Sequence, residues 1–156
     1  MADAVKSAST EVRCDRFVVN HAQGAVYETD GLREEFVYRD LGVADATGGT
    51  VHAHVIRARH LEGGHNGMHR HVVDWQFAMV LKGWVTFFYE DHGLIRYDAG
   101  DAVTIPGGTL HELRDYSSDL ELLEITIPAV YDTVRADGSA MPTPGQKERI
   151  RERTGG

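Results

Sequence analysis

Short runs of strand-forming residues, separated by turns that contain glycine, constrain the fold of this chain more than any other feature. The runs are rich in Val, Ile, Thr, Phe and Tyr, which suit the pleated, half-buried surface of a sheet. Between them, Lys82-Gly83 and residues 91–93 have the length and composition of β-hairpin turns. We therefore predict an all-β fold, an antiparallel sandwich or barrel. The clearest strands cover residues 50–59, 74–83, 84–90, 94–98, 101–106 and 120–128.

The two ends of the chain carry a different signal. Residues 145–153 (GQKERIRER) contain a single apolar residue, Ile150, which predicts a solvated terminal helix or a disordered tail. Residues 135–145 are rich in Gly, Pro and small polar residues, which is typical of a linker or of an arm laid on a neighbouring subunit. The predicted organisation is a disordered N-terminal segment at 1–15, a barrel domain at 16–130 and a C-terminal arm or tail at 131–156.

Length and charge limit the partners. The chain has 156 residues, enough for one compact domain with a sizeable core. Its 16 Lys and Arg residues against 24 Asp and Glu residues give a net charge of -8, which repels nucleic acid and anionic membranes. We therefore expect no nucleic-acid or membrane partner, and we expect the ligand to be a neutral or weakly charged small molecule.

Cys14 is the single cysteine, so no intrachain disulfide can form and a reducing compartment is expected. The N-terminal stretch MADAVKSAST has no apolar core of signal-peptide length, and no run is long enough to cross a bilayer. These features predict a cytoplasmic protein. Cys14 has no histidine close to it in the sequence, so we expect no catalytic role for its thiol.

A histidine-rich stretch, GGHNGMHRHVVDWQ at residues 63–76, holds the first candidate site. In a strand, residues i and i+2 share a face and lie about 7 Å apart, so His69 and His71 can converge on one metal ion. Alternating histidines also occur on solvated strands, and His52 and His54 form a second such pair. Taken alone, either pair leaves metal binding and a solvated surface both open.

Gln76 lies five positions beyond His71, so strict alternation would send it to the opposite face of the strand. The chain must therefore turn or bulge at residues 72–74 if the two side chains are to meet. If one strand ends at His71 and the next begins at Gln76, they face each other across a corner. Ala78 and Val80 then share the face of Gln76, as small apolar residues of a pocket wall would.

Two more residues belong to the candidate set. Asp74 falls in the corner itself and is the carboxylate rival of Gln76 as a ligand, although a corner residue need not point inwards. His111 follows the tight turn Pro106-Gly107-Gly108, which delivers it onto the next strand. A surface histidine after a turn is the alternative interpretation of His111.

Together these stretches resemble the two sequence motifs of the cupin superfamily, in particular its small single-domain members. The first motif is matched in every spacing, with glutamine where the family usually has glutamate. It runs Gly63, five residues, His69-x-His71, four residues, Gln76, six residues, Gly83. The second runs Gly100, five residues, Pro106-x-Gly108, two residues, His111, with Asp115 where the family motif usually ends in asparagine.

The resemblance implies an antiparallel jelly-roll barrel with a short C-terminal helix or tail. It also implies one divalent metal ion per chain, with Fe, Mn, Zn and Ni all compatible with nitrogen and oxygen ligands. Carried over position by position, the metal ligands are His69, His71, Gln76 and His111. The glycines of the motifs need only a structural role, in turns and at close backbone approaches.

A glutamine ligand would change the chemistry of such a site. Three imidazoles and a neutral amide leave the full +2 charge on the ion, which makes it a stronger Lewis acid than with glutamate. Glutamine cannot accept a proton, so a base must come from elsewhere, and His52, His54, His65 or a metal-bound hydroxide are candidates. His52 and His54 are also candidates for a fifth ligand or a partner of a ligand. His65 is expected to be a solvated loop residue.

The three-histidine set with open coordination positions leads to the functional hypotheses. The first is a small metalloenzyme of dioxygenase type that acts on a small dicarbonyl or phenolic substrate. The alternatives are a zinc-type non-redox cyclase or isomerase and a non-catalytic sensor of a small molecule or metal. A homodimer is expected in each case, because a strand edge at residues 15–20 (DRFVVN) and the C-terminal arm invite pairing with a second subunit.

Overall fold

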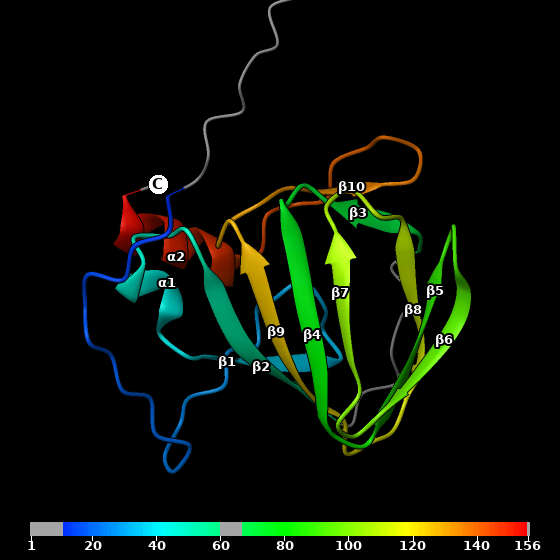
Figure 1. Cartoon of the computed structure of the whole chain (residues 1–156), viewed down its shortest axis with the longest axis horizontal. Coiled ribbons are helices and arrows are strands. Elements are labelled where there is room, and N and C mark those ends of the chain that lie inside the picture. The colour runs from blue at the N-terminus through cyan, green and yellow to red at the C-terminus, as the bar shows by residue number, and fades with distance from the viewer. Residues whose placement is uncertain (1–10, 60–66, 156) are drawn as a thin grey trace, which may run out of the picture.

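The computed structural model describes residues 11–59 and 67–155. They form two five-stranded antiparallel sheets that face each other across the core, as in a jelly-roll barrel (Figure 1). One sheet has the order β1-β2-β9-β4-β7, with β1 Phe36–Asp40, β2 His52–Ala58, β9 Glu121–Ile127, β4 Trp75–Lys82 and β7 Ala102–Pro106. The other has the order β10-β3-β8-β5-β6, with β10 Thr133–Arg135, β3 His69–His71, β8 His111–Tyr116, β5 Trp84–Tyr89 and β6 Gly93–Asp98. The helices are α1 Val43–Ala46 and α2 Gly145–Thr154.

The predicted all-β fold is confirmed, and each of the six predicted runs contains a strand. The turn at 91–93 joins β5 to β6 in an antiparallel hairpin, as expected. The hairpin predicted at Lys82-Gly83 is wrong, because β4 pairs with β7 and β9 in one sheet, whereas β5 pairs with β6 and β8 in the other. Turn residues specify that the chain reverses, but they do not specify whether it stays in the same sheet.

The corner predicted at residues 72–74 is confirmed, since β3 and β4 belong to different sheets. The turn after β7 packs tightly against this corner: a Cβ on Gly107 would collide with the backbone oxygen of Val73. The next residue, Gly108, has a φ of 80° and donates its N–H to the carbonyl of His71 at 3.1 Å. These two glycines hold the start of β8 against β3.

The terminal helix predicted for 145–153 is confirmed as α2, but the prediction that this segment is solvated or disordered is wrong, because α2 packs on the barrel. Ile150 is fully buried against Ala44 and Ala129. On the other face, Arg149 binds Asp30 and Arg153 binds Asp40 and Asp45, which covers the helix with ion pairs. One apolar residue suffices because the stems of neighbouring polar side chains are buried with it.

β10 and α2 both lie within the stretch 131–156 that was predicted as an arm or tail. β10 pairs with β3 of the same chain, with Thr133 opposite His71. In Figure 1 α2 lies beside α1 at one end of the barrel. The C-terminal stretch therefore contributes to the wall around the candidate site.

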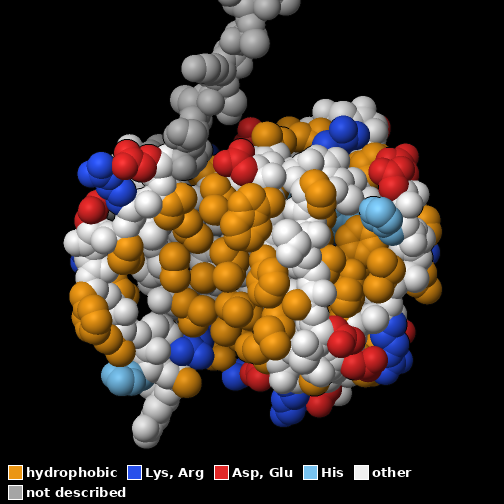
Figure 2. Space-filling view, in the orientation of Figure 1, with side chains coloured by type: hydrophobic (Ala, Val, Ile, Leu, Met, Phe, Trp, Pro, Cys, Tyr) orange, Lys and Arg blue, Asp and Glu red, His pale blue; other side chains and the backbone are white. Residues whose placement is uncertain are grey.

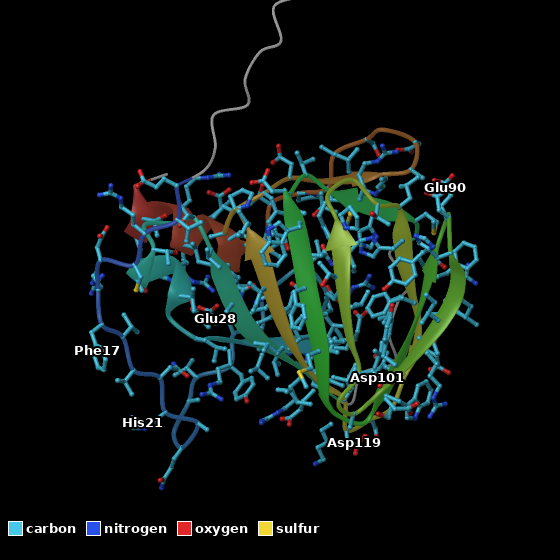
Figure 3. All side chains as sticks on the ribbon, viewed as in Figure 1. Phe17, His21, Glu28, Glu90, Asp101 and Asp119 are labelled. Carbon is cyan, nitrogen blue, oxygen red and sulfur yellow. The ribbon has the colours of Figure 1, made fainter. Side chains whose placement is uncertain are left out.

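The strand edge predicted at 15–20 is wrong, since this segment runs along the barrel without forming a strand. One backbone hydrogen bond joins it to the body, from the N–H of Asp15 to the carbonyl of Ala46 at 3.0 Å. The rest of the attachment is made by side chains, as when Arg39 donates to Asn20 Oδ1 at 2.9 Å. Phe17 is 96% exposed and points away from the molecule (Figure 3). Most of the predicted disordered segment, residues 1–10, lies outside the described residues.

The core lies between the two sheets. Its largest cluster joins inward residues of both, namely Phe36, Tyr38, Ile56, Ala58, Val80, Val85, Tyr89, Tyr97, Ile105, Leu113, Leu120 and Leu122. Toward β3, buried polar side chains replace these apolar ones. None of the helices in the described part of the chain is long and apolar enough to cross a membrane.

Candidate metal centre

Three buried histidines meet where β3 and β8 pair. His69 and His71 lie two residues apart on β3, and His69 is directly opposite His111 at the start of β8. The three residues are 1%, 6% and 4% exposed. One ring nitrogen from each lies within 4.8 Å of the others. Residues that the sequence placed in two separate motifs are thus brought together on one side of the cavity.

The second ring nitrogen of each histidine is already engaged. Each Nδ1 lies within hydrogen-bond distance of an oxygen atom: His69 of Gly67 O at 2.8 Å, His71 of Thr133 Oγ1 at 2.9 Å, and His111 of Thr109 O at 2.8 Å. A carbonyl oxygen can only accept, so the proton of His69 and that of His111 lie on Nδ1. Their Nε2 lone pairs are left for an ion, which is the arrangement that metal-bound histidines usually show.

Burial keeps this cluster uncharged. It lowers the pKa of His69 to about 4 and the pKa of His71 well below its usual value. It also lowers the pKa of His111. Neutral imidazole is the form that binds metal, so the histidines do not have to lose protons at neutral pH before an ion binds.

Gln76 faces the same cavity from the opposite sheet. It is 5% exposed and lines the cavity with Ala78 and Val80, as the corner predicted. Its side chain makes no hydrogen bond with the residues that the structure describes. A neutral amide oxygen is therefore available beside the three imidazoles, and its role as fourth ligand stays a prediction.

Other sequence candidates lie elsewhere. Asp74 is exposed at the corner and is absent from the cavity lining. Asp115 is exposed on β8, where its carboxylate accepts the N–H of Tyr116. Gly63 and His65 lie outside the described residues.

His52 and His54 belong to a buried hydrogen-bonded chain, in which His54 lines the cavity and His52 does not. Gln146 of α2 donates its amide N–H to His54 Nδ1 at 3.3 Å, and His52 Nε2 lies 3.1 Å from the same atom. His54 Nδ1 is therefore an acceptor, and the proton of this ring is on Nε2. That N–H donates to the carboxylate of Glu124 at 2.9 Å. His54 therefore donates a hydrogen bond to a carboxylate in this structure, and neither of its ring nitrogens is left for a metal ion.

Glu124 is the site residue that the sequence analysis missed. It lies on β9 opposite Ala78 of β4, so it shares the inward face with Gln76 and lines the same cavity. Burial alone would raise the pKa of Glu124, but the hydrogen bond from His54 and the positive charges nearby lower it to about 2. A charged residue in phase with Leu122, on the inward face of a central strand, was the signal that could have found it.

The donor set fits a divalent transition metal. Three neutral imidazoles and a nearby amide oxygen suit Fe, Mn, Zn or Ni. The hydrogen bonds at the three Nδ1 atoms fix the ring orientations and leave each Nε2 for the ion. Spacing, burial and hydrogen bonds thus agree with the histidine positions of the two motifs. Residues 58–126 match the sequence model of the family described as Cupin domain. The chain contains a cupin domain.

Solved structures with the same fold extend the match beyond the motifs. KdgF from Halomonas sp. is 16% identical, with a TM-score of 0.57 over 71% of this chain and 94% of that chain. The polyketide cyclase RemF from Streptomyces resistomycificus is 17% identical, with a TM-score of 0.59 over 74% and 82%. The DMSP lyase DddQ from Ruegeria pomeroyi DSS-3 is 21% identical, with a TM-score of 0.53 over 81% and 62%. These similarities establish the cupin fold alone. No curated protein matches the chain.

Part of the cavity comes from outside the matched cupin segment. His54 precedes residue 58, and Tyr131, Gln146 and Lys147 follow residue 126, yet all four line the cavity. The Tyr131 ring lies 5.2 Å from the His71 ring, and Lys147 Nζ lies 4.8 Å from the Tyr131 ring. Part of the cavity wall is therefore supplied by elements that the two cupin motifs do not describe.

Proposed function

We propose that this cupin domain holds one divalent metal ion through His69, His71 and His111, with Gln76 as the fourth ligand, and that it is an enzyme. The proposed reaction class is non-redox proton transfer on a small carbonyl compound, as in a cyclase or an isomerase. The observation that supports this class is an ionised carboxylate, Glu124, in the same cavity as an all-neutral ligand set. A strong Lewis acid and a separate base are the two parts that enolisation needs.

Each part has a distinct task. A divalent ion in the histidine centre supplies Lewis acidity that polarises a carbonyl oxygen. Glu124 accepts a proton from the carbon beside that carbonyl, and returns it to a different atom of the substrate. His54 holds the carboxylate in place with its Nε2–H and keeps it ionised. The apolar walls exclude water, which strengthens these electrostatic interactions.

Exchange of substrate hydrogen for deuterium tests this class without knowledge of the product. Zn-loaded protein in D₂O, without oxygen, is expected to exchange the α-hydrogens of some compound in a panel of small diketones and oxo acids. Glu124→Gln should slow this exchange at least about a hundredfold and retain the metal, because general bases contribute factors of that size.

The matched control is Glu121→Gln. Glu121 lies on the same strand as Glu124 but forms an ion pair with Arg57, which is half exposed. The control should exchange at the wild-type rate. Equal rates for Glu124→Gln and wild-type protein would contradict the proposed base.

A dioxygenase is the second candidate, because a cluster of three buried histidines suits iron as well as zinc. This candidate predicts oxygen uptake by Fe-loaded protein with a dicarbonyl or phenolic compound. Full turnover by Zn-loaded protein without oxygen would exclude it. Tight binding of a compound with no change in it, under either metal, would favour the sensor.

We also propose that the protein forms a homodimer. The outward face of the first sheet is apolar where β9 and β4 meet, because Trp75 lies opposite Ile127 and Phe77 opposite Ile125. Figure 2 shows a broad hydrophobic surface over β2, β9 and β4. Trp75 is still 38% exposed. Apolar patches of this kind on a soluble chain usually mark an interface.

A further inference from the structure

Arg33 is a buried cation in the cavity that the proposed reaction does not use. It lies in the turn before β1, and its side chain is 9% exposed. It lines the same cavity as the three histidines. Its backbone N–H donates to the hydroxyl of Tyr38 at 3.1 Å, which fixes where the side chain starts. A guanidinium group this far from water needs acceptors.

The described residues provide a counter-charge for this group but no hydrogen bond. Arg33 Nη1 is buried without a hydrogen bond, and the nearest carboxylate oxygen, Glu35 Oε1, lies 3.5 Å away and is also unpaired. No side-chain hydrogen bond of Arg33 is found within residues 11–59 and 67–155. A guanidinium has five donors in a planar fork that matches a carboxylate, so this group is built to bind one.

A second buried cation lies in the same cavity wall as Arg33. This is Lys147, and one of its three donors is used, by the carbonyl of Ala129 at 3.3 Å. Two acidic residues line the cavity, Glu124 and Asp101. Glu124 accepts the hydrogen bond from His54 at the position of the proposed base, and Figure 3 places Asp101 near the end of the barrel where the strand turns gather. The wall therefore carries charges of both signs, and the recognition of an anion depends on the free donors of Arg33.

We infer that Arg33 binds a carboxylate group of the substrate, which makes the substrate a small oxo acid whose carbonyl lies at the histidine centre. This substrate class rests on the proposed function. It differs from the neutral ligand that the net charge of -8 predicts, because that charge is spread over the whole surface and does not describe the cavity.

Binding of small oxo acids tests the inference. Each acid, for example acetoacetate or pyruvate, is titrated against its uncharged amide by calorimetry. The tested variant is Arg33→Gln with Glu35→Gln, which removes both charges of the loose pair and leaves the net charge unchanged. At least one acid should bind wild-type protein tenfold or more tightly than its amide. The double variant should lose at least tenfold in affinity for that acid and keep its affinity for the amide within about twofold.

The matched control is Arg57→Gln with Glu121→Gln. It removes an ion pair on the outside of the barrel, in which Arg57 Nε lies 2.7 Å from Glu121 Oε1. It should bind acids and amides as wild-type protein does. If the double variant at 33 and 35 does not fold, Arg33→Lys keeps the charge but loses the fork, and a several-fold weaker binding of the acid is expected.

Two readouts separate this inference from the proposed function. Metal content is measured for each protein, and the same titrations are repeated on metal-free protein, where an acid can be recognised by Arg33 without the ion. A chain that binds no metal refutes the proposed function and leaves the acid preference of metal-free protein as the test of Arg33. Equal affinity for every acid and its amide, or an acid preference that survives in the double variant, overturns the inference.

Discussion

Glutamine at position 76 leaves the expected ligand set without a carboxylate, and Glu124 brings one into the cavity from the neighbouring strand. Because Glu124 pairs in register with Ala78, two residues along from Gln76, the carboxylate lies beside the ligand position and not in it. A carboxylate in that place is free to accept a proton, whereas a metal-bound one would lower the charge of the ion. A neutral ligand at position 76 and a separate carboxylate at position 124 together make the site suited to proton transfer.

The variant Gln76→Glu tests this separation of roles. It should retain the metal, because glutamate is also an oxygen ligand. Deuterium exchange should fall at least about tenfold, since a charged glutamate ligand makes the ion a weaker Lewis acid. Exchange at or above the wild-type rate, with equal metal content, would show that the neutral ligand has no role.

Lys147 gives the stability of the fold a specific dependence on pH. Burial lowers the pKa of Lys147 from 10.5 to about 8, although Glu124 and Asp40 act in the opposite direction. The folded state therefore disfavours the protonated amine, and this cost is complete below pH 8. As pH rises from 8 to 10.5 the folded protein loses the proton before the unfolded chain does, so the cost disappears. At about 1.4 kcal/mol per pH unit, the gain is about 3 kcal/mol.

The measurement is urea unfolding of wild-type protein and Lys147→Met at several pH values. The free energy of unfolding of wild-type protein should rise relative to the variant by about 3 kcal/mol between pH 8 and 10.5. The comparison with the variant cancels the titration of tyrosines and other groups. A constant difference between the two proteins over this range would mean that Lys147 titrates normally in the fold.

At the scale of elements, local patterns predicted the strands well and the pairing of the strands less well. The histidine positions were predictable because their spacing is set within single motifs, and the corner at 72–74 followed from the alternation of side chains. The hairpin predicted at Lys82-Gly83 was wrong because the turn residues do not specify which sheet the next strand joins. The same limit applies to Glu124, since register with β4 and β2 places it in the cavity.

α2 was predicted as a helix without contacts, because its sequence has no apolar periodicity. Its burial depends on partners that are distant in sequence, with Ala44 and Ala129 around Ile150 and acidic residues placed to meet its arginines. The element matters for the site, since Gln146 and Lys147 line the cavity from it. The composition of this segment does not reveal that role, just as the net charge of the chain does not reveal the two buried cations of the cavity wall.

The variant Ile150→Ala tests the contribution of α2. Ile150 is fully buried, so its truncation should reduce the free energy of unfolding by about 2 to 4 kcal/mol, as measured with urea. Leu94→Ala is the control, because Leu94 is 63% exposed on β6 and its loss should change stability by about 0.5 kcal/mol or less. Equal effects of the two substitutions would mean that α2 is not anchored by this residue.

At the scale of the whole molecule, the two faces of the sheet that contains β4 have different tasks. Gln76, Ala78 and Val80 point to the cavity, while Trp75 and Phe77 point outwards. The inner face carries the proposed chemistry and the outer face the proposed interface. Association through the outer face would leave the cavity and its histidines unchanged.

The variant Phe77→Glu tests the interface by sedimentation at micromolar concentration. A charge in the apolar face should convert a wild-type dimer to a monomer, because an unpaired carboxylate is costly to bury. Metal content should stay the same. The exposed control Leu94→Glu, on the other sheet, should remain dimeric. A monomeric wild-type protein would remove the homodimer proposal.

The central claim is that the three buried histidines form a metal centre, and elemental analysis of protein purified without chelator tests it most directly. Wild-type protein should contain about one equivalent of a divalent transition metal per chain, and His111→Ala should lose it while keeping a folded circular dichroism spectrum. Gln76→Ala should hold the metal more weakly if the amide is a ligand. Wild-type protein that takes up no Fe, Mn, Zn or Ni, even when the ions are supplied, or a His111→Ala variant that retains a full equivalent, would contradict the account.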